Sequence, residues 1–143
     1  MKGPIQSVEA SYILHATEDE EKVRSALAKL LGVDVEPVLE ELEGHYGNPV
    51  RMASVHLTGD EATAAFRSVV RGLSPAARAD LVSSLSVRVD EHSSLFIRVD
   101  KQGLVSGIAA LGDRDTVRLK VKPRGFVPKG AGAQHFAKLI GGN

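Results

Sequence analysis

The sequence contains no cysteine and no tryptophan. Without cysteine the chain has no disulfide, no thiolate metal ligand and no thiol nucleophile, so its stability and any chemistry must come from other groups. Its 18 basic and 18 acidic side chains cancel to a formal net charge of zero, which excludes a polycation or an acidic tail. No apolar stretch is long enough for a signal peptide or a membrane span, so we expect a cytoplasmic protein with no membrane partner.

The charges that are present are unevenly distributed along the chain. Residues 1–71 contain 7 Lys/Arg and 12 Asp/Glu, whereas residues 72–143 contain 11 Lys/Arg and 6 Asp/Glu. The two halves therefore carry formal charges of −5 and +5. Such a separation is typical of a protein that has an acidic face and a basic face, of which the basic face binds a polyanion.

The pattern of apolar residues predicts a single α+β domain. With 143 residues and 43% apolar content, the chain can form one sizeable core. Alternating or β-rich segments predict strands over residues 7–14, 33–42, 50–57, 87–89, 95–99 and 116–122. The order β-α-β-β-α-α-β-β-β favours an α+β fold in which helices cover one face of a largely antiparallel or mixed sheet. We expect this domain to span residues 1–124, followed by a Gly/Lys-rich, partly ordered and partly helical tail over residues 125–143.

Local signals predict the helix ends. Thr17 with Glu20 and Thr58 with Glu61 have the spacing of capping boxes, and Gly32 is expected to end the first helix in a left-handed conformation. A third, short helix is expected to begin at the Ser-Pro pair of residues 74–75. Pro37 indicates that the strand over residues 33–42 is irregular or lies at a sheet edge.

Three cations alternate with apolar residues in the last predicted strand. Arg118, Lys120 and Lys122 share one face there, about 7 Å apart, which is close to the spacing of successive phosphates. Arg124 and Lys129 extend the row. This pattern predicts contacts with a nucleic-acid backbone. The alternative is a solvated sheet face on which edge lysines prevent aggregation.

An aromatic residue accompanies cations on the preceding predicted hairpin. Its apolar face comprises Val87, Val89, Leu95, Ile97 and Val99, which leaves Arg88, Phe96 and Arg98 on the other face. A phenylalanine between arginines is typical of a platform on which unpaired bases stack. Alternatively, Phe96 lies under a helix or in a dimer contact.

The segment over residues 43–49 combines a restricted backbone with chemically active side chains. Gly44 and Gly47 allow φ > 0 or a close approach, and the Asn48-Pro49 pair favours a turn or extended geometry. The segment is therefore predicted to be a stiff turn that carries the imidazole of His45 and the phenol of Tyr46. The alternative is a turn whose glycines serve the backbone alone.

Catalytic chemistry is weakly supported. The candidate catalytic residues are the histidines His15, His45 and His56 and the carboxylates of Glu18, Asp19 and Glu43. These side chains could bind a metal or act as general bases. However, no two histidines have helical i, i+4 spacing, no serine lies in a nucleophile elbow, and no Gly-rich phosphate loop is present. We therefore expect no enzyme activity, no metal and no cofactor.

Three motifs occur in an order that resembles a known family. They lie at residues 15–23, 43–49 and 98–102, and the chain resembles archaeal RNA-binding proteins described as predicted exosome subunits. The resemblance covers most of residues 6–124. It implies an α+β sandwich similar to that of a large-subunit ribosomal protein that binds ribosomal RNA. It also implies RNA binding, association with RNA-processing or ribosome-biogenesis machinery, and no family catalytic residue.

We therefore expect a non-catalytic RNA-binding protein, an accessory subunit in exosome-associated RNA processing or in ribosome biogenesis. Its expected partners are RNA and exosome or ribosomal proteins, with homodimer formation left open. The alternative is an assembly subunit without RNA contact, whose acidic N-terminal half docks a partner protein. The residues expected to contact RNA are Arg118, Lys120, Lys122, Arg124, Arg88, Arg98, Lys101, Phe96, His45, Tyr46 and Asn48.

Overall fold

Five strands and six helices form in the computed structural model, which describes residues 3–42 and 49–141. The strands are β1 Ile5–His15, β2 Val38–Leu42, β3 Val50–Thr58, β4 Leu95–Asp100 and β5 Thr116–Pro123. The helices are α1 Glu20–Leu31, α2 Gly59–Gly72, α3 Pro75–Ser83, α4 Leu85–Arg88, α5 Lys101–Val105 and α6 Gly132–Gly141. None of the helices in the described ranges combines the length and the apolar character that a bilayer span needs.

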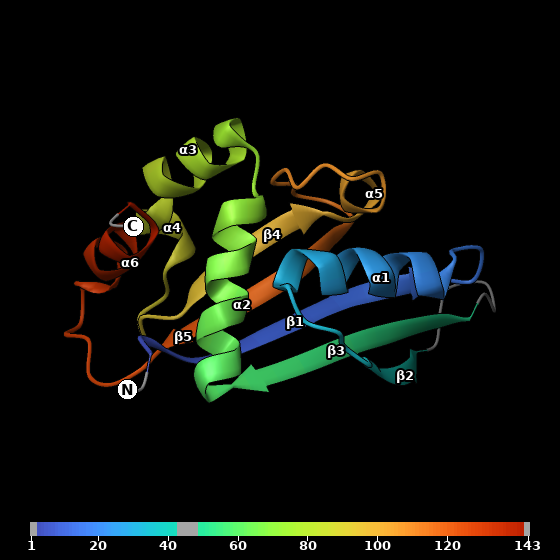
Figure 1. Cartoon of the computed structure of the whole chain (residues 1–143), viewed down its shortest axis with the longest axis horizontal. Coiled ribbons are helices and arrows are strands. Elements are labelled where there is room, and N and C mark those ends of the chain that lie inside the picture. Colours follow the sequence, from blue (N-terminus) through green and yellow to red (C-terminus); the bar gives the residue numbers. More distant parts are fainter. Residues whose placement is uncertain (1–2, 43–48, 142–143) are drawn as a thin grey trace.

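The strands form one antiparallel sheet in the order β2-β3-β1-β5-β4. The central strand, β1, alternates as expected, with Val8, Ala10, Tyr12 and Leu14 buried. Helices α1 and α2 lie across the face onto which these side chains point (Figure 1), and the sheet viewed from below shows both on the same side. The predicted α+β class is confirmed. We call the opposite side, which α1 and α2 leave uncovered, the open face.

The first helix begins two residues later than the predicted capping box. Asp19, rather than Thr17, is the N-cap of α1, and its carboxylate accepts hydrogen bonds from the backbone N–H groups of Glu21 at 3.0 Å and Lys22 at 3.2 Å. The helix ends as predicted, because Gly32 adopts a left-handed φ of 72° that few other residues tolerate. Thr58 occupies the N-cap of α2, but its side chain accepts no capping hydrogen bond within the described part of the chain.

The predicted strand over residues 87–89 is wrong. Residues 85–88 form the short helix α4, and Val89 makes a single antiparallel bridge with Leu95. Leu85 of α4 is buried in the core, as is Leu81 of the preceding helix α3. Val87, which was expected on the apolar face of a hairpin, is 83% exposed.

Two further segments refine the expected boundaries. Only β2 forms within the predicted strand over residues 33–42, and it lies at a sheet edge, as Pro37 indicated. Beyond residue 124, helix α6 buries Phe136 completely in the hydrophobic core. The Phe136 ring meets Phe66 of α2 edge-on, with 6.1 Å between the ring centroids. The core therefore includes side chains from the last segment of the chain.

The Tyr12 hydroxyl is buried under the helices and has no hydrogen-bond partner among the described residues. Burial, followed by the nearby Glu20 carboxylate, raises the pKa of Tyr12 to about 12. An unsatisfied buried hydroxyl costs about 1–3 kcal/mol. We therefore expect Tyr12→Phe to keep or to raise the free energy of unfolding, by up to about 1 kcal/mol in urea titrations. A loss of stability would show that the hydroxyl has a partner.

Candidate nucleic-acid interface

The expected cations and the aromatic residue meet on the open face of the sheet. Strands β4 and β5 are neighbours, and their register places Phe96 opposite Lys120 and Arg98 opposite Arg118. On the other side of β5, Lys120 lies opposite Glu9 of β1 and Lys122 lies opposite Ser7. The apolar partners Val117, Leu119 and Val121 point into the core, which fixes the cations on the opposite side of the strand.

The positive charge of this row is largely unneutralised. None of Arg118, Lys120 and Lys122 has a carboxylate oxygen within 4.0 Å among residues 3–42 and 49–141. Glu9, the nearest acid across the strand pair, instead lies 3.7 Å from His56 Nε2. The Arg98 and Arg118 side chains are directly opposite each other, an arrangement that costs energy when no anion is bound.

Phe96 is half-buried on the open face, where it lines a depression together with residues of α4. The Arg118 guanidinium carbon is 4.9 Å from the Phe96 ring centroid, and Lys120 Nζ is 5.8 Å from it. Cation–π contacts of this kind hold a cation in place. Unlike a carboxylate, the ring does not neutralise the charge, so both cations remain able to bind phosphate.

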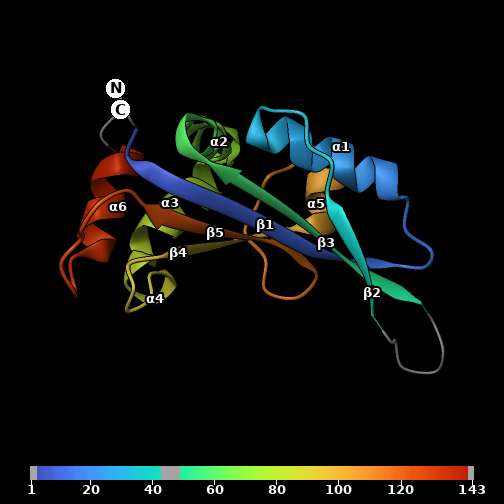
Figure 2. The same ribbon diagram turned by 90° about the horizontal axis from the view of Figure 1, so that it is seen from below.

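Two adjoining depressions hollow the open face, and both are lined by Arg118. The first, of about 530 Å³, lies against α4 and is lined by Arg88, Asp90, Phe96, Arg98 and Asp113 besides Arg118. The second, of about 440 Å³, extends toward β2 and includes Ser11, Val38, Ser54 and Lys120. Figure 2 shows α4 on the side of the sheet that faces away from α1 and α2. The open face is thus a shallow trough between α4 and β2.

Lys101 does not widen this surface, contrary to expectation. Its side chain is 0% exposed, and its ammonium contacts Glu18 Oε1 at 2.7 Å, Asp115 Oδ1 at 3.0 Å and the backbone carbonyl of Ile13. These partners lie far from Lys101 in the sequence or beyond α5, so no local pattern predicts them. Lys101 therefore joins the end of β1 to the segment before β5 and has no free charge for RNA.

The acids around Lys101 are held in their charged form. Burial alone would raise the pKa of Glu18, but hydrogen bonds from Lys101, from the His15 backbone and from Gln102 outweigh it and lower the pKa. The pKa of Asp115 is lowered in the same way, by Lys101 and Gln102 against the effect of burial. Both carboxylates are therefore ionised near neutral pH, as the buried ammonium requires.

His15 and His56, the two described histidines of the group considered for catalysis, lie far apart on the sheet. His56 is opposite Glu9, six residues from His15 along β1, which places the two imidazoles about 20 Å apart. His15, Glu18 and Asp115 do bring possible ligand atoms within 4.8 Å of one another. However, the Lys101 ammonium already binds both carboxylates. A lysine thus supplies the positive charge that a metal would otherwise bring.

The remaining expected residues divide into three groups. Arg124 follows β5, and its Nε donates to the Gly3 carbonyl at 3.0 Å, so this side chain is tied to the start of the chain. Arg88 reaches the open face from α4 instead of from a strand. His45, Tyr46 and Asn48 lie outside the described residues.

Phe126 is a candidate that the sequence patterns did not indicate. Its side chain is 90% exposed, and it lines a depression with His92 and Lys122. It follows Gly125, which has a left-handed φ of 80°. The sequence feature that could have identified Phe126 is its position as a lone aromatic residue between Gly125 and Pro128, directly after the cationic strand.

Comparisons with known proteins agree with this geometry. A family profile described as RNA binding matches residues 7–123. An uncharacterized protein of Methanocaldococcus jannaschii is 30% identical over 132 residues, which cover 87% of this chain and 89% of that protein. An RNA-binding protein of Pyrococcus abyssi is 30% identical over 138 residues, 90% of each chain. The crystal structure of a DUF54 protein of Archaeoglobus fulgidus, 31% identical, has a TM-score of 0.79 over 95% of this chain and 99% of that one. The chain therefore belongs to the RNA-binding family that these archaeal proteins represent, as the motif resemblance predicted.

Proposed function

We propose that this protein binds RNA through the open face of its sheet and acts without catalysis, as an accessory subunit in RNA processing or ribosome biogenesis. The observation that carries the proposal is the row of Arg118, Lys120 and Lys122, which has no carboxylate partner within the described residues and lies beside Phe96. Membership of an RNA-binding family and the name of the Pyrococcus abyssi relative support it.

In this proposal the row of cations contacts successive phosphates. Arg88 and Arg98 extend the contact toward α4, Arg124 extends it past the end of β5, and Phe96 stacks against a base. His45, Tyr46 and Asn48 add a second contact region in this proposal. Lys101 is left out, because its ammonium is buried and paired.

The exposed edge strand favours a second candidate function. Each residue of β2 is exposed, and two of them are the acids Glu40 and Glu41. An uncovered edge can pair with a strand of another protein, and acidic side chains favour a basic partner. In an assembly subunit of this kind, β2 would carry the function and the open face would bind no RNA.

Salt dependence distinguishes the two functions. If about five phosphates are neutralised, the logarithm of the affinity for single-stranded RNA should fall with the logarithm of salt concentration with a slope near −3.5. Fluorescence anisotropy with a labelled oligoribonucleotide between about 50 and about 400 mM KCl, roughly an eightfold range, measures this slope. No binding at the lowest salt would reject RNA binding and favour docking at β2, whereas binding with a slope near zero would reject the phosphate contacts of the cation row.

A further inference from the structure

Three guanidinium groups converge on one depression of the open face. Arg88 comes from α4, Arg98 from β4 and Arg118 from β5, and all three line the hollow of about 530 Å³ against α4. Segments that are ten and twenty residues apart in sequence thus bring their positive charges to one place. Arginines without anionic partners repel one another, so their convergence favours a site for an anion.

The nearby groups hold the arginines in position without neutralising them. Arg88 Nε donates to the Ser84 hydroxyl at 2.6 Å, which leaves the two terminal nitrogens of the fork free of hydrogen bonds to the described residues. Among those residues, neither Arg98 nor Arg118 has a carboxylate oxygen within 4.0 Å. A planar guanidinium with free N–H groups suits the bidentate binding of a phosphate.

The acids of the depression do not cancel these charges. Asp90 Oδ1 accepts the backbone N–H groups of His92 and Ser94, both at 2.9 Å, and thereby forms the turn that leads into β4. Asp113 is exposed and lies next to Gly112 in the lining. Neither carboxylate is within 4.0 Å of an arginine or lysine nitrogen of the described chain.

The same depression offers a stacking surface. Phe96 lines it with the Arg118 guanidinium 4.9 Å from its ring centroid, and both planar groups can stack against a base. A volume of about 530 Å³ falls within the range of small-ligand sites, about 300–1,000 Å³. An anion site beside a stacking surface has the chemistry to hold one nucleotide.

We propose that the depression against α4 holds one unpaired nucleotide of a single-stranded RNA, with its phosphate on Arg88 and Arg98 and its base against Phe96 and Arg118. This inference rests on the proposed RNA binding and adds a preference for single strands. An A-form duplex keeps its bases stacked inside, so it presents phosphates to the cation row but no base to the depression. Helix α4 lies on this side of the sheet (Figure 2) and forms one wall of the depression.

The test compares a labelled single-stranded oligoribonucleotide with a duplex of the same sequence. We expect the wild type to bind the single strand more tightly. Arg88→Gln and Phe96→Leu should each lower that affinity about tenfold and change duplex affinity by less than about twofold. Arg67→Gln, on the helix-covered side, is the matched control and should change neither affinity. Melting curves confirm that each variant folds.

Adenosine monophosphate and inorganic phosphate are the small probes. We expect AMP to shift the Arg88 and Arg98 Nε–H signals in NMR spectra more than an equal concentration of inorganic phosphate does, and we expect this excess to disappear in Phe96→Leu. Equal binding of single strand and duplex, unaffected by Arg88→Gln, would overturn the nucleotide site but leave RNA binding intact. Loss of all RNA binding at low salt would instead overturn the proposed function.

Discussion

Replacing Arg118, Lys120 and Lys122 together with glutamine should lower the affinity for single-stranded RNA about a hundredfold at 0.1 M salt. Each phosphate contact to a single strand contributes about −0.7 to the salt slope, so the loss of three contacts reduces the slope by about 2. The fold should survive, since these side chains make no ion pair in the described chain and the core side of β5 is unchanged. Anisotropy titrations at several salt concentrations measure both the affinity and the slope.

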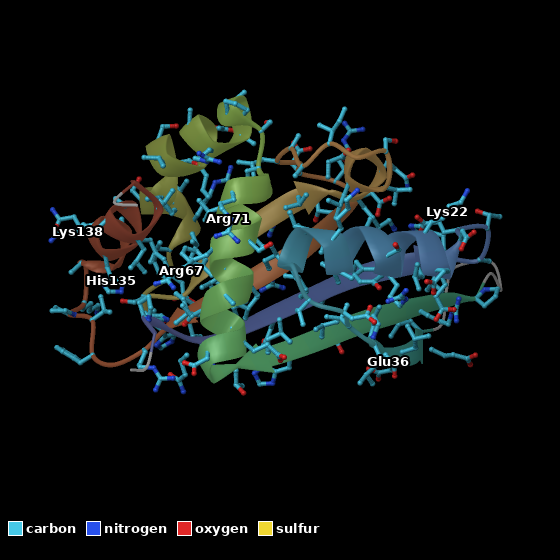
Figure 3. The ribbon with its side chains drawn as sticks, viewed as in Figure 1. Lys22, Glu36, Arg67, Arg71, His135 and Lys138 are labelled. Atoms are coloured by element: carbon cyan, nitrogen blue, oxygen red, sulfur yellow. The ribbon has the colours of Figure 1, made fainter. Side chains whose placement is uncertain are left out.

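A charge-matched variant controls for non-specific attraction. Figure 3 shows Lys22 on α1 and Arg67 and Arg71 on α2, on the helix-covered side of the sheet. Replacing these three with glutamine removes the same net charge from the opposite side of the molecule. We expect this variant to bind RNA within about threefold of the wild type, because screening limits the reach of distant charges to about 10 Å. Equal losses in both triple variants would mean that RNA does not select the open face.

Replacing Lys101 with methionine should lower the free energy of unfolding by about 2–3 kcal/mol. Breaking a buried ion pair costs about 3–5 kcal/mol. We expect less here because the side chains of Glu18 and Asp115 are 15% and 38% exposed, so water can solvate them once the ammonium is gone. Methionine keeps most of the packing of the lysine stem. Urea unfolding at pH 7 measures the difference, with Lys22→Met as an exposed-lysine control.

The dependence of stability on pH provides a second readout for Lys101. The folded pKa values of Glu18 and Asp115 lie below their ordinary values of 4.5 and 3.8. The two carboxylates therefore stabilise the folded state fully at pH values above their ordinary pKa values. This stabilisation is lost as the pH falls through their lowered, folded-state pKa values. We expect the wild type to lose stability below about pH 4.5, and the difference from Lys101→Met to shrink there. A difference that stays constant with pH would show that packing, and not the ion pairs, accounts for the loss.

The sequence predicted elements whose signal is local. The alternation around Arg118 and Lys120 follows from the two-residue period of a strand, which puts alternate side chains on one face wherever that strand lies in the sheet. Gly32 could likewise be assigned to a helix end because a left-handed conformation depends on that residue itself. The signal was ambiguous near Val87, where two leucines spaced by four and two valines spaced by two favour different structures. The structure has a short helix there, in which Leu85 reaches the core and Val87 is exposed.

What surrounds a charged side chain was decided by the tertiary structure alone. In the sequence, Lys101 and Lys122 both follow an apolar-rich segment, yet Lys122 lies on the open face and Lys101 is buried against Ile13 and Glu18, 88 and 83 residues away. The meeting of Arg88 with Arg98 and Arg118 likewise depends on how α4 folds back against β4. Where the type of element was predicted correctly, as in β1 and β5, the sequence by itself determined which residues share a face, because this follows from backbone geometry. Which charges remain free was decided by contacts between distant segments, which carry no local signature.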